Sequence, residues 1–178
     1  MNVLSLFDGM SCGRLALYRA GVTVENYYAS EIDKHAITIS KKNNPDIIQL
    51  GNVENWKEWN IDWSKIDLLI GGSPCQGFSF AGKQLNFNDP RSRLFFVYVD
   101  ILNHIKTNNP NVKFLLENVR MKKEYQNVIT EKLGVMPVQI NSALLSAQNR
   151  VRLYWTNIKG NGLLGEITQP EDKNILLK

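Results

Sequence analysis

Short apolar runs that alternate with helical patterns are the feature of this chain that most restricts its fold. Several runs have the length and composition of buried strands, at residues 2–7, 26–32, 46–52, 67–73 and 112–118. Apolar residues at helical spacing lie between several of these runs, at 14–21, 33–44 and 93–106. Strands that alternate with helices form a parallel sheet covered on both faces. The order predicts an α/β fold with a Rossmann-like, doubly wound, mostly parallel sheet.

Two later runs, at 138–145 and 151–158, predict further strands that form an antiparallel hairpin at one edge of the sheet. In sheets of this kind the ligand lies at the carboxyl ends of the parallel strands. The unusual polar residues of the chain cluster at those predicted ends. We therefore expect the functional site there.

The length of 178 residues fits one domain, which can bury a sizeable core without crosslinks. A hydrophobic content of 43% with 21% charged residues is typical of a globular protein and excludes a disordered or repetitive chain. The net charge of +4 is compatible with a polyanionic partner, although basic clusters are also common on solvated surfaces.

Cys12 and Cys75 are the two cysteines, too few for a metal site of their own or for a disulfide framework. No metal is expected, and the cysteine content fits a reducing compartment. The longest apolar run, residues 94–99, is far too short to span a membrane. Residues 1–9 lack the pattern of an export signal, so a cytoplasmic location is predicted.

The turn after the first predicted strand has the sequence "FDGMSCG" and contains Asp8, Gly9, Ser11, Cys12 and Gly13. Backbone N–H groups at the start of the following helix can receive an anion there. The spacing of the glycines is not that of the dinucleotide pattern G-x-G-x-x-G. A tight turn without ligand is an equally good interpretation of this stretch by itself.

Glu31 ends the second predicted strand, 18 positions after Gly13. This is close to the offset of about 20 residues at which an acid binds ribose hydroxyls in such folds. The alternative is an acid at the start of the next helix, a role for which Asp33 competes. Ile32 offers an apolar face for an adenine ring, or a core side chain. Together the turn and Glu31 favour an adenosine-type cofactor.

Cys75 follows the fourth predicted strand, and Pro74 stiffens the chain just before it. An isolated cysteine is more often a small buried apolar residue than a nucleophile. At the ligand edge of a parallel sheet, however, the thiol would face the cofactor site, where nearby arginines or a helix N-terminus could lower its pKa. The position therefore favours a nucleophile.

Glu117 lies at the end of the fifth predicted strand and should reach the same edge as Cys75, unless it is a loop acid turned to solvent. Gln148, Arg150 and Arg152 recur at every second position, so on a strand they would share one face. Such a face is either an exposed sheet surface or, beside a site, a surface that recognises an anion or a base.

Five segments together make the chain resemble the catalytic domain of a DNA (cytosine-5)-methyltransferase. They are "FDGMSCG", "SEID", "GGSPCQGFS", "LLENV" and "QNRVRLYW", in the order of that family and within residues 2–158. The resemblance implies the class I S-adenosylmethionine-dependent methyltransferase fold. It also implies methyl transfer from S-adenosylmethionine to carbon 5 of a cytosine flipped out of DNA.

The resemblance also implies residue roles. Cys75 would attack carbon 6 of the base, Glu117 would hold ring nitrogen 3 and the exocyclic amine, and Arg152, with Arg150, would hold the ring oxygen and orient the glutamate. The implied cofactor-binding residues are Phe7, Asp8, Gly9, Ser11, Cys12, Gly13, Glu31, Ile32, Asn52 and Pro74. Asn52 departs from the acid usual at its position. The implied DNA-binding residues are Gln76, Ser79, Lys83, Arg91 and Gln148, most of them on a mobile loop at 76–92.

The resemblance places the catalytic domain at residues 1–158 and leaves residues 159–178 as the start of a linker. The family's target recognition domain and the returning segment that completes the cofactor domain do not fit in that length. We therefore expect a fold incomplete at its C-terminus, as a truncated gene product or as one part of a split enzyme. A complementary chain would then carry the recognition domain, and this chain alone would bind DNA weakly or not at all and could be inactive. Apolar surface would be exposed where the missing part packs.

Three alternatives remain at this point. A tRNA cytosine-5 methyltransferase would use the same catalytic residues. A catalytically silent cofactor-binding or scaffolding module would keep the fold without the activity. A dinucleotide-dependent oxidoreductase is disfavoured by the absence of G-x-G-x-x-G.

Overall fold

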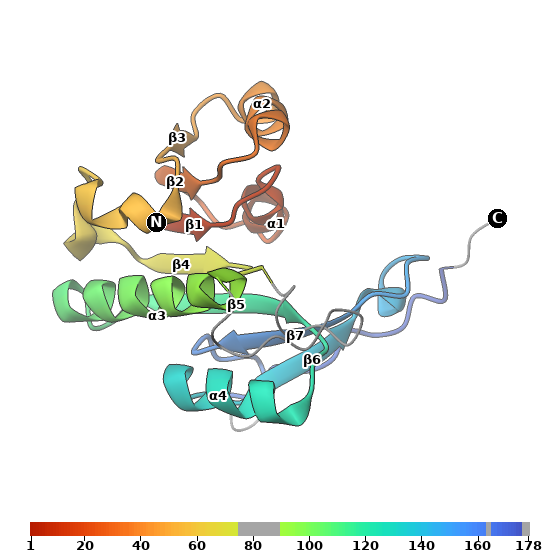
Figure 1. Ribbon diagram of the computed structural model, residues 1–178. Coiled ribbons are helices and arrows are strands. Elements are labelled where there is room, and N and C mark those ends of the chain that lie inside the picture. The colour runs from red at the N-terminus through yellow and green to blue at the C-terminus, as the bar shows by residue number, and fades with distance from the viewer. Residues whose placement is uncertain (75–89, 163–164, 176–178) are drawn as a thin grey trace.

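A seven-stranded sheet with the order β3-β2-β1-β4-β5-β7-β6 organises the protein (Figure 1). The computed structural model describes residues 1–74, 90–162 and 165–175, and for residues 90–92 it describes the backbone only. Strands β1 to β5 pair in parallel, whereas β7 is antiparallel to both β5 and β6. The strands are β1 (Asn2–Leu6), β2 (Asn26–Ser30), β3 (Ile48–Gln49), β4 (Leu68–Gly71), β5 (Lys113–Val119), β6 (Pro137–Asn141) and β7 (Val151–Thr156).

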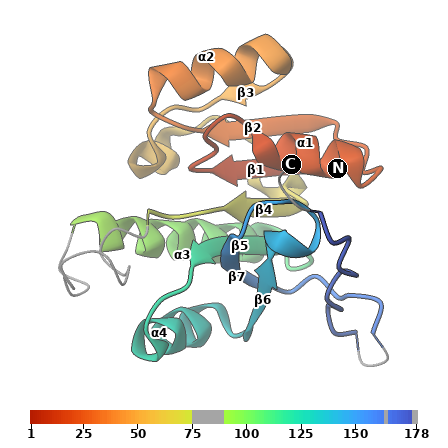
Figure 2. The same cartoon turned by 90° about the vertical axis from the view of Figure 1, so that its right-hand side faces the viewer.

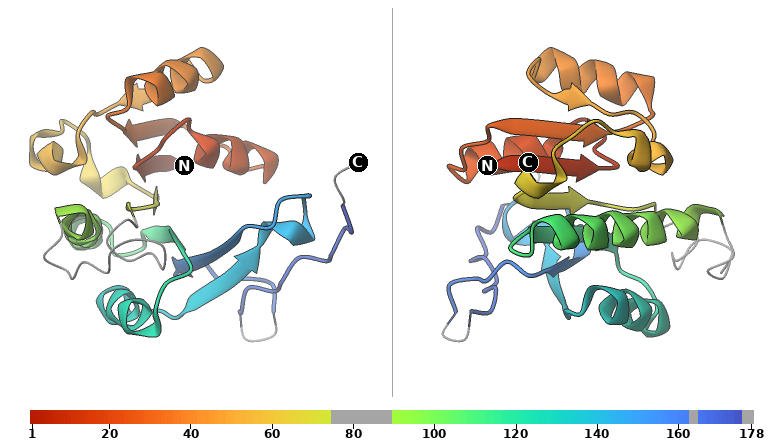
Figure 3. Two further views of the ribbon diagram at one scale, coloured as in Figure 1. Left: turned by 45° about the vertical axis from the view of Figure 1, so that its right-hand side comes forward. Right: turned by 90° about the vertical axis from the view of Figure 1, so that its left-hand side faces the viewer.

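Helices cover both faces of the sheet, as Figures 2 and 3 show from opposite sides. Helices α3 and α4 lie on one face, and α1 and α2 lie toward the other. The α-helices are α1 (Cys12–Arg19), α2 (Lys34–Asn43), α3 (Pro90–Asn108) and α4 (Lys123–Leu133), with short 3₁₀ helices η1 (Val53–Glu58), η2 (Trp63–Lys65) and η3 (Ser142–Leu144). Among the described residues, none of the helices combines the length and apolar character needed to cross a membrane.

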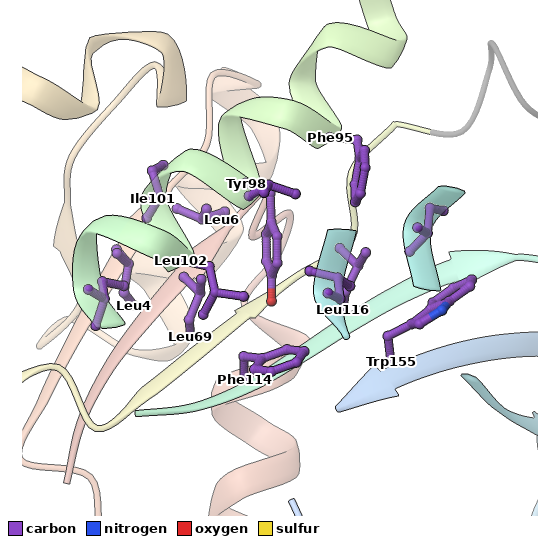
Figure 4. Packing of buried hydrophobic residues seen from close by; sticks show 14 of the residues in the cluster. Leu4, Leu6, Leu69, Phe95, Tyr98, Ile101, Leu102, Phe114, Leu116 and Trp155 are labelled. Atoms are coloured by element: carbon purple, nitrogen blue, oxygen red, sulfur yellow. The ribbon is translucent and has the colours of Figure 1, made fainter. Parts of the chain in front are cut away.

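The main core fills the space between the sheet and the α3 and α4 face (Figure 4). Side chains alternate along each strand, so Phe114 and Leu116 of β5 enter this core while Leu115 and Glu117 point to the opposite face. Trp155 of β7 is fully buried in the same core. A smaller core under α1 includes Tyr27 of β2. The two faces of the sheet therefore differ, and Glu117 is on the less covered one.

The predicted fold class, the parallel order and the antiparallel edge hairpin are confirmed. Three predicted segments differ most from the observed ones. The third strand has two residues, the run at 138–145 turns into η3 after Asn141, and the predicted loop at 76–92 ends earlier because α3 begins at Pro90. Proline at the first turn of a helix is favourable because its missing N–H has no partner there anyway.

Helix α4 was not predicted, although the chain carries a signal for it. Tyr125, Ile129 and Leu133 are four residues apart, and Ile129 and Leu133 are buried against the sheet. Gly134 then ends the helix with a φ of 72°, a left-handed conformation that glycine adopts without steric cost.

Candidate active site

The register of the parallel strands brings four chain segments to one edge of the sheet. Leu6 of β1 pairs with Ser30 of β2 on one side and with Gly71 of β4 on the other. Gly71 in turn pairs with Leu116 of β5. The residues that follow these positions therefore meet at one end of the strands. They are the first turn, Glu31, the segment that leads to Cys75, and Glu117 near the end of β5.

Glu117 forms an ion pair with an arginine from the neighbouring strand. Its Oε1 lies 2.8 Å from Nε of Arg152 and 3.9 Å from a terminal nitrogen of Arg150. The Arg152 side chain is 18% exposed and the Arg150 side chain 50% exposed. A partly buried, close pair holds a carboxylate more firmly than an exposed, distant one. Arg152 is therefore the main partner of Glu117.

The prediction that Gln148, Arg150 and Arg152 share one face of a strand was only partly right. Strand β7 begins at Val151, so Arg152 lies on the strand, whereas Gln148 and Arg150 precede it. The carbonyl of Gln148 accepts a hydrogen bond from the Ser142 hydroxyl at 2.8 Å, which belongs to a turn rather than to a sheet ladder. Both residues are exposed, and Arg150 lines the groove beside Glu117.

Gly72 and Tyr154 shape the space around the Glu117 carboxylate. A Cβ on Gly72 would lie 3.0 Å from Oε2 of Glu117, so a side chain there would push the carboxylate away. Tyr154 pairs directly with Glu117 across the strands. Burial, together with the negative charge of Glu117, raises the pKa of the Tyr154 hydroxyl against the opposing effect of Arg150 and Arg152. Tyr154 is therefore a neutral neighbour of the carboxylate.

Asn118 connects the end of β5 to the segment that precedes Cys75. It is buried, and its Nδ2 donates to the carbonyl and hydroxyl oxygens of Ser73 at 3.3 and 3.4 Å. Pro74 follows and lines a cavity. Cys75 itself lies outside the described residues, as do Gln76, Ser79 and Lys83. The backbone of Arg91 belongs to α3, and its side chain is not among those described.

The first turn has an unusual backbone that Glu31 supports from the next strand. Phe7, Gly9 and Ser11 have φ values of 57°, 58° and 64°. The N–H of Gly9 donates to Oε2 of Glu31 at 2.8 Å, and Oε1 accepts from the N–H groups of Ile32 and Asp33 at 2.7 and 2.9 Å. Glu31 is therefore fixed in place next to the first turn.

Asp33, not Glu31, takes the helix-capping role that sequence reasoning left open. Its Oδ1 accepts hydrogen bonds from the N–H groups of His35 and Ala36, the first turn of α2. These hydrogen bonds lower the pKa of the Asp33 carboxyl, that of Ala36 most and that of His35 next. The carboxylate of Glu31 remains at the edge of the cavity.

A cavity of about 220 Å³ lies between the first turn, the end of β2 and the start of α3. Ile32 is 71% exposed there, which excludes the core role considered for it. The lining consists of Phe7, Ser30, Glu31, Ile32, Asn52, Val53, Glu54, Pro74 and Leu94. Apolar walls with a carboxylate at one side suit a purine nucleoside. Leu94 was missed because its helical spacing indicated only a core helix.

Asn52 and the start of α3 hold one wall of this cavity. Oδ1 of Asn52 accepts from the N–H of Glu54 at 3.1 Å and thereby caps η1. Glu54 forms an ion pair with Arg93, the residue next to Leu94. The side chain of Asn52 borders the cavity as predicted, although one of its oxygen lone pairs is already used.

The remaining residues of the first turn lie along a second, more open groove of about 460 Å³. Asp8, Cys12 and Gly13 border this groove on one side, and Glu117 and Arg150 border it on the other. Ser11 is buried instead. A Cβ on Gly13 would lie 2.5 Å from Cδ1 of Ile70, so glycine is needed there for close packing of α1 on the sheet. Among the described residues, no cluster of metal-ligating side chains occurs.

Comparison with known proteins assigns this arrangement to a family. The model of the C-5 cytosine-specific DNA methylase family matches residues 1–162, which is most of the chain. The chain belongs to this family. Its predicted resemblance is thus confirmed, and the dinucleotide oxidoreductase alternative is disfavoured. Methyltransferases of this family use S-adenosylmethionine.

The relatives of this family member include bacterial and phage methyltransferases. The orphan methyltransferase M.SPRI of Bacillus phage SPR is 37% identical over 89% of the chain and 38% of its own length. The orphan methyltransferase M.Rho11sI of Bacillus phage rho11s is 35% identical over 89% of the chain and 33% of its own length. The type II methyltransferase M.NgoBV of Neisseria gonorrhoeae is 34% identical over 99% of the chain and 46% of its own length. The chain thus spans less than half the length of these relatives.

Solved structures with the same fold include two DNMT2 proteins. A DNMT2 mutant from Spodoptera frugiperda superposes with a TM-score of 0.63 and 24% identity, covering 99% of this chain and 54% of that one. The Dnmt2 methyltransferase of S. pombe superposes with a TM-score of 0.59 and 19% identity, covering 91% of this chain and 51% of that one. These similarities confirm the class I methyltransferase fold.

Proposed function

We propose that this chain is the cofactor-binding and catalytic part of a DNA cytosine-5 methyltransferase that acts through a covalent cysteine intermediate. One observation carries the proposal. Glu117, which is paired with Arg152, lines the same groove as the first turn, at the sheet edge where the chain runs from Pro74 into Cys75. Family membership supports the same conclusion.

The cavity beside the first turn fits the adenosine part of S-adenosylmethionine. Phe7, Ile32 and Leu94 offer apolar contacts for the adenine ring, with Pro74 closing one side. Each oxygen of Glu31 already accepts backbone hydrogen bonds but can accept more, here from the ribose hydroxyls. The first turn lies beside the methionine end. When bound, the cofactor supplies a methyl group activated by its positively charged sulfur.

The chain's own residues would activate the cytosine. Carbon 5 of the neutral base is a weak nucleophile, so the Cys75 thiolate first forms a bond to carbon 6. Glu117 holds ring nitrogen 3 and the exocyclic amine and limits the negative charge that develops on the base. Arg152 keeps the glutamate in position and reaches toward the ring oxygen, with Arg150 in support.

The covalent adduct must then collapse. After carbon 5 has taken the methyl group, a base removes its proton and the electron pair restores the double bond between carbons 5 and 6. The bond from carbon 6 to sulfur breaks, and Cys75 leaves as a thiolate. A cytosine in a duplex is out of reach of such a site, so the base has to be flipped out.

Double-stranded DNA is the proposed partner. Gln76, Ser79, Lys83 and Arg91 would contact it from the segment after Cys75, and Gln148 from the exposed turn before β7. We place the catalytic domain at residues 1–158 and a connecting segment at 159–178. Gln169 Nε2 donates to the carbonyl of Gln139 at 2.8 Å, so part of that segment runs along β6.

A complementary chain that carries a recognition domain is a further proposed partner. The face of β4, β5 and β7 opposite α3 is covered by no described helix beyond α1 (Figure 2). Ile70, Leu115 and Tyr154 line the groove on this face. Apolar side chains on a less covered sheet face are a common feature of docking surfaces, which supports packing of a second polypeptide beside the catalytic groove.

Covalent trapping tests the activity. Duplex DNA that contains 5-fluorocytosine in many sequence contexts is incubated with the protein, S-adenosylmethionine and any complementary chain that carries the recognition domain, because fluorine at carbon 5 blocks the final elimination. A protein–DNA adduct that survives denaturation is expected for the wild type and is absent for Cys75→Ser. Adduct that persists in Cys75→Ser contradicts the mechanism. An RNA substrate of the same base content, if trapped in preference to DNA, would favour the tRNA alternative.

Calorimetric titration tests the cofactor independently of DNA. S-adenosylhomocysteine is expected to bind the wild type, and NAD is not. Glu31→Gln should weaken the binding of S-adenosylhomocysteine about tenfold, because the ribose hydroxyls lose a hydrogen bond to a charged group. Binding of NAD in place of S-adenosylhomocysteine would overturn the assignment of the cavity.

A further inference from the structure

A set of hydroxyl groups surrounds the Asp8 carboxylate beneath the first turn. Oδ1 accepts from the Tyr27 hydroxyl at 2.7 Å and from the Ser5 hydroxyl at 2.6 Å. Oδ2 accepts from the Ser11 hydroxyl. The three donors come from β2, β1 and the turn itself. The carboxylate of Asp8 is therefore bound by the protein's own side chains.

The direction of each hydrogen bond follows from the chemistry of the carboxylate. An ionised carboxylate accepts only, so Ser11 spends its single hydroxyl hydrogen on Asp8. The hydroxyl of Ser40, 2.6 Å from that of Ser11, must then be the donor between the two. Gln49 Nε2 lies 3.4 Å from the Ser40 hydroxyl and donates to it. The chain of donors thus runs from β3 through α2 to Asp8.

Tyr27 has the most restrained position in this network. Its side chain is 1% exposed, and burial together with the Asp8 charge raises the pKa of its hydroxyl far above the ordinary value. The hydroxyl therefore stays protonated and remains a donor. A Cβ on Gly13 would lie 3.0 Å from the same oxygen, so Tyr27 also sets how closely the start of α1 approaches the sheet.

The backbone of the first turn needs such support. Phe7 and Ser11, on either side of Asp8, have positive φ values, which are unfavourable for residues with a side chain. Among the described residues, the N–H groups of Cys12 and Gly13 at the start of α1 have no backbone partner. They border the open groove. An anion could therefore be received there, provided that the turn keeps this conformation.

We propose that Tyr27, with Ser40 as its counterpart on α2, is a positioning residue that holds the first turn ready for the carboxylate of the cofactor's methionine part. The inference rests on the proposed function and deepens it. Asp8 is then an inward anchor of the turn, and backbone N–H groups receive the ligand. Neither Tyr27 nor Ser40 touches the ligand, so each acts through Asp8 and Ser11.

Two ligands separate this role from general support of the fold. S-adenosylhomocysteine carries the amino acid carboxylate, whereas 5′-methylthioadenosine has the same adenosine and sulfur without it. Calorimetry on Tyr27→Phe should give about tenfold weaker binding of S-adenosylhomocysteine, with 5′-methylthioadenosine changed less than about twofold. Ser40→Ala should shift the same ratio in the same direction. Damage to the whole domain would weaken both ligands alike.

Tyr98→Phe is the matched control. Tyr98 is fully buried in the other core, and its hydroxyl has no partner within the described part of the chain, so its loss should leave both affinities unchanged. Equal weakening of both ligands by Tyr27→Phe and Ser40→Ala, or no weakening by either, would overturn the inference. If Tyr27→Phe fails to fold, Ser40→Ala decides. Failure of the wild type to bind S-adenosylhomocysteine would instead overturn the proposed function.

Discussion

Arg152 Nε lies 2.8 Å from Oε1 of Glu117, across the antiparallel junction of β7 with β5. The two residues are separated by a long stretch of sequence, and the edge hairpin brings them together. Because the Arg152 side chain is 18% exposed, the pair is shielded from much of the solvent. A carboxylate held in this way can keep one orientation while it binds a base.

Loss of Arg152 should therefore impair catalysis more than loss of Arg150. Arg152→Ala is expected to lower the rate of methyl transfer by about 100-fold, because Glu117 loses its close partner. Arg150→Ala, whose guanidinium is more distant and half-exposed, should lower it by less than about tenfold. Transfer of a labelled methyl group to DNA measures both. Equal losses in the two variants would contradict the assignment of Arg152 as main partner.

Gly72→Ala tests the space reserved for the Glu117 carboxylate. The added Cβ would stand 3.0 Å from Oε2 and displace it by a few tenths of an ångström. The rate of covalent trapping is expected to fall about tenfold, while the dissociation constant of S-adenosylhomocysteine stays the same. The free energy of unfolding should fall by less than about 1 kcal/mol. An unchanged trapping rate would show that the carboxylate has room to move.

Ile32→Ala tests the exposed apolar wall of the cavity. Because Ile32 is 71% exposed, its truncation should leave the free energy of unfolding nearly unchanged. It should weaken the binding of S-adenosylhomocysteine by about fivefold to tenfold, because apolar contact with the adenine is lost. Ile39→Ala is the control, since Ile39 is also exposed but lies on α2 outside this cavity. Equal effects of both variants on ligand affinity would argue against adenine binding at Ile32.

Asp33 provides a prediction for pH dependence. Its pKa is lowered in the folded state by the N–H groups of Ala36 and His35, so the ionised cap stabilises the fold above the ordinary aspartate pKa of about 3.9. That contribution is lost as the pH falls through the lower, folded-state pKa. The stability difference between wild type and Asp33→Ala, measured by urea unfolding, should therefore shrink in acid.

Asp33→Asn serves as the control for this measurement. Its amide oxygen can still cap α2 but does not titrate in this range. The difference in unfolding free energy between Asp33→Asn and Asp33→Ala should therefore stay constant with pH. The difference between the wild type and Asp33→Ala should change. If the difference between the wild type and Asp33→Ala also stayed constant with pH, the role of the ionised carboxylate would be contradicted.

The sequence was enough to predict the architecture because the relevant signals are local and strong. Buried parallel strands need continuous apolar runs, and each helix between them needs its own apolar stripe. Helix α4 was not predicted, although Tyr125, Val128, Ile129 and Leu133 follow helical spacing. The end of β6 was misplaced because hydrogen bonding with a partner strand, and not composition, decides where a strand ends.

The candidate site was predictable in its residue types but not in its arrangement. Position at a strand end identified Glu31 and Glu117, and the same reasoning identified Cys75, which lies outside the described residues. Which of Glu31 and Asp33 caps α2 depended on the direction of the chain after β2. The inward orientation of Asp8 could not be read from "FDG", because its donors Tyr27 and Ser5 come from two strands that meet only in the sheet.

The sequence alone therefore determined the order of strands and helices apart from α4, the family and the set of polar residues available at one edge, since these follow from patterns along a single stretch of chain. Only the tertiary structure decided which of those residues touch. Arg152 reaches Glu117 because β7 turns antiparallel beside β5, and Tyr27 reaches Asp8 because β2 lies next to β1. Contacts between distant segments depend on strand register and side-chain direction, and both are set by packing of the whole sheet.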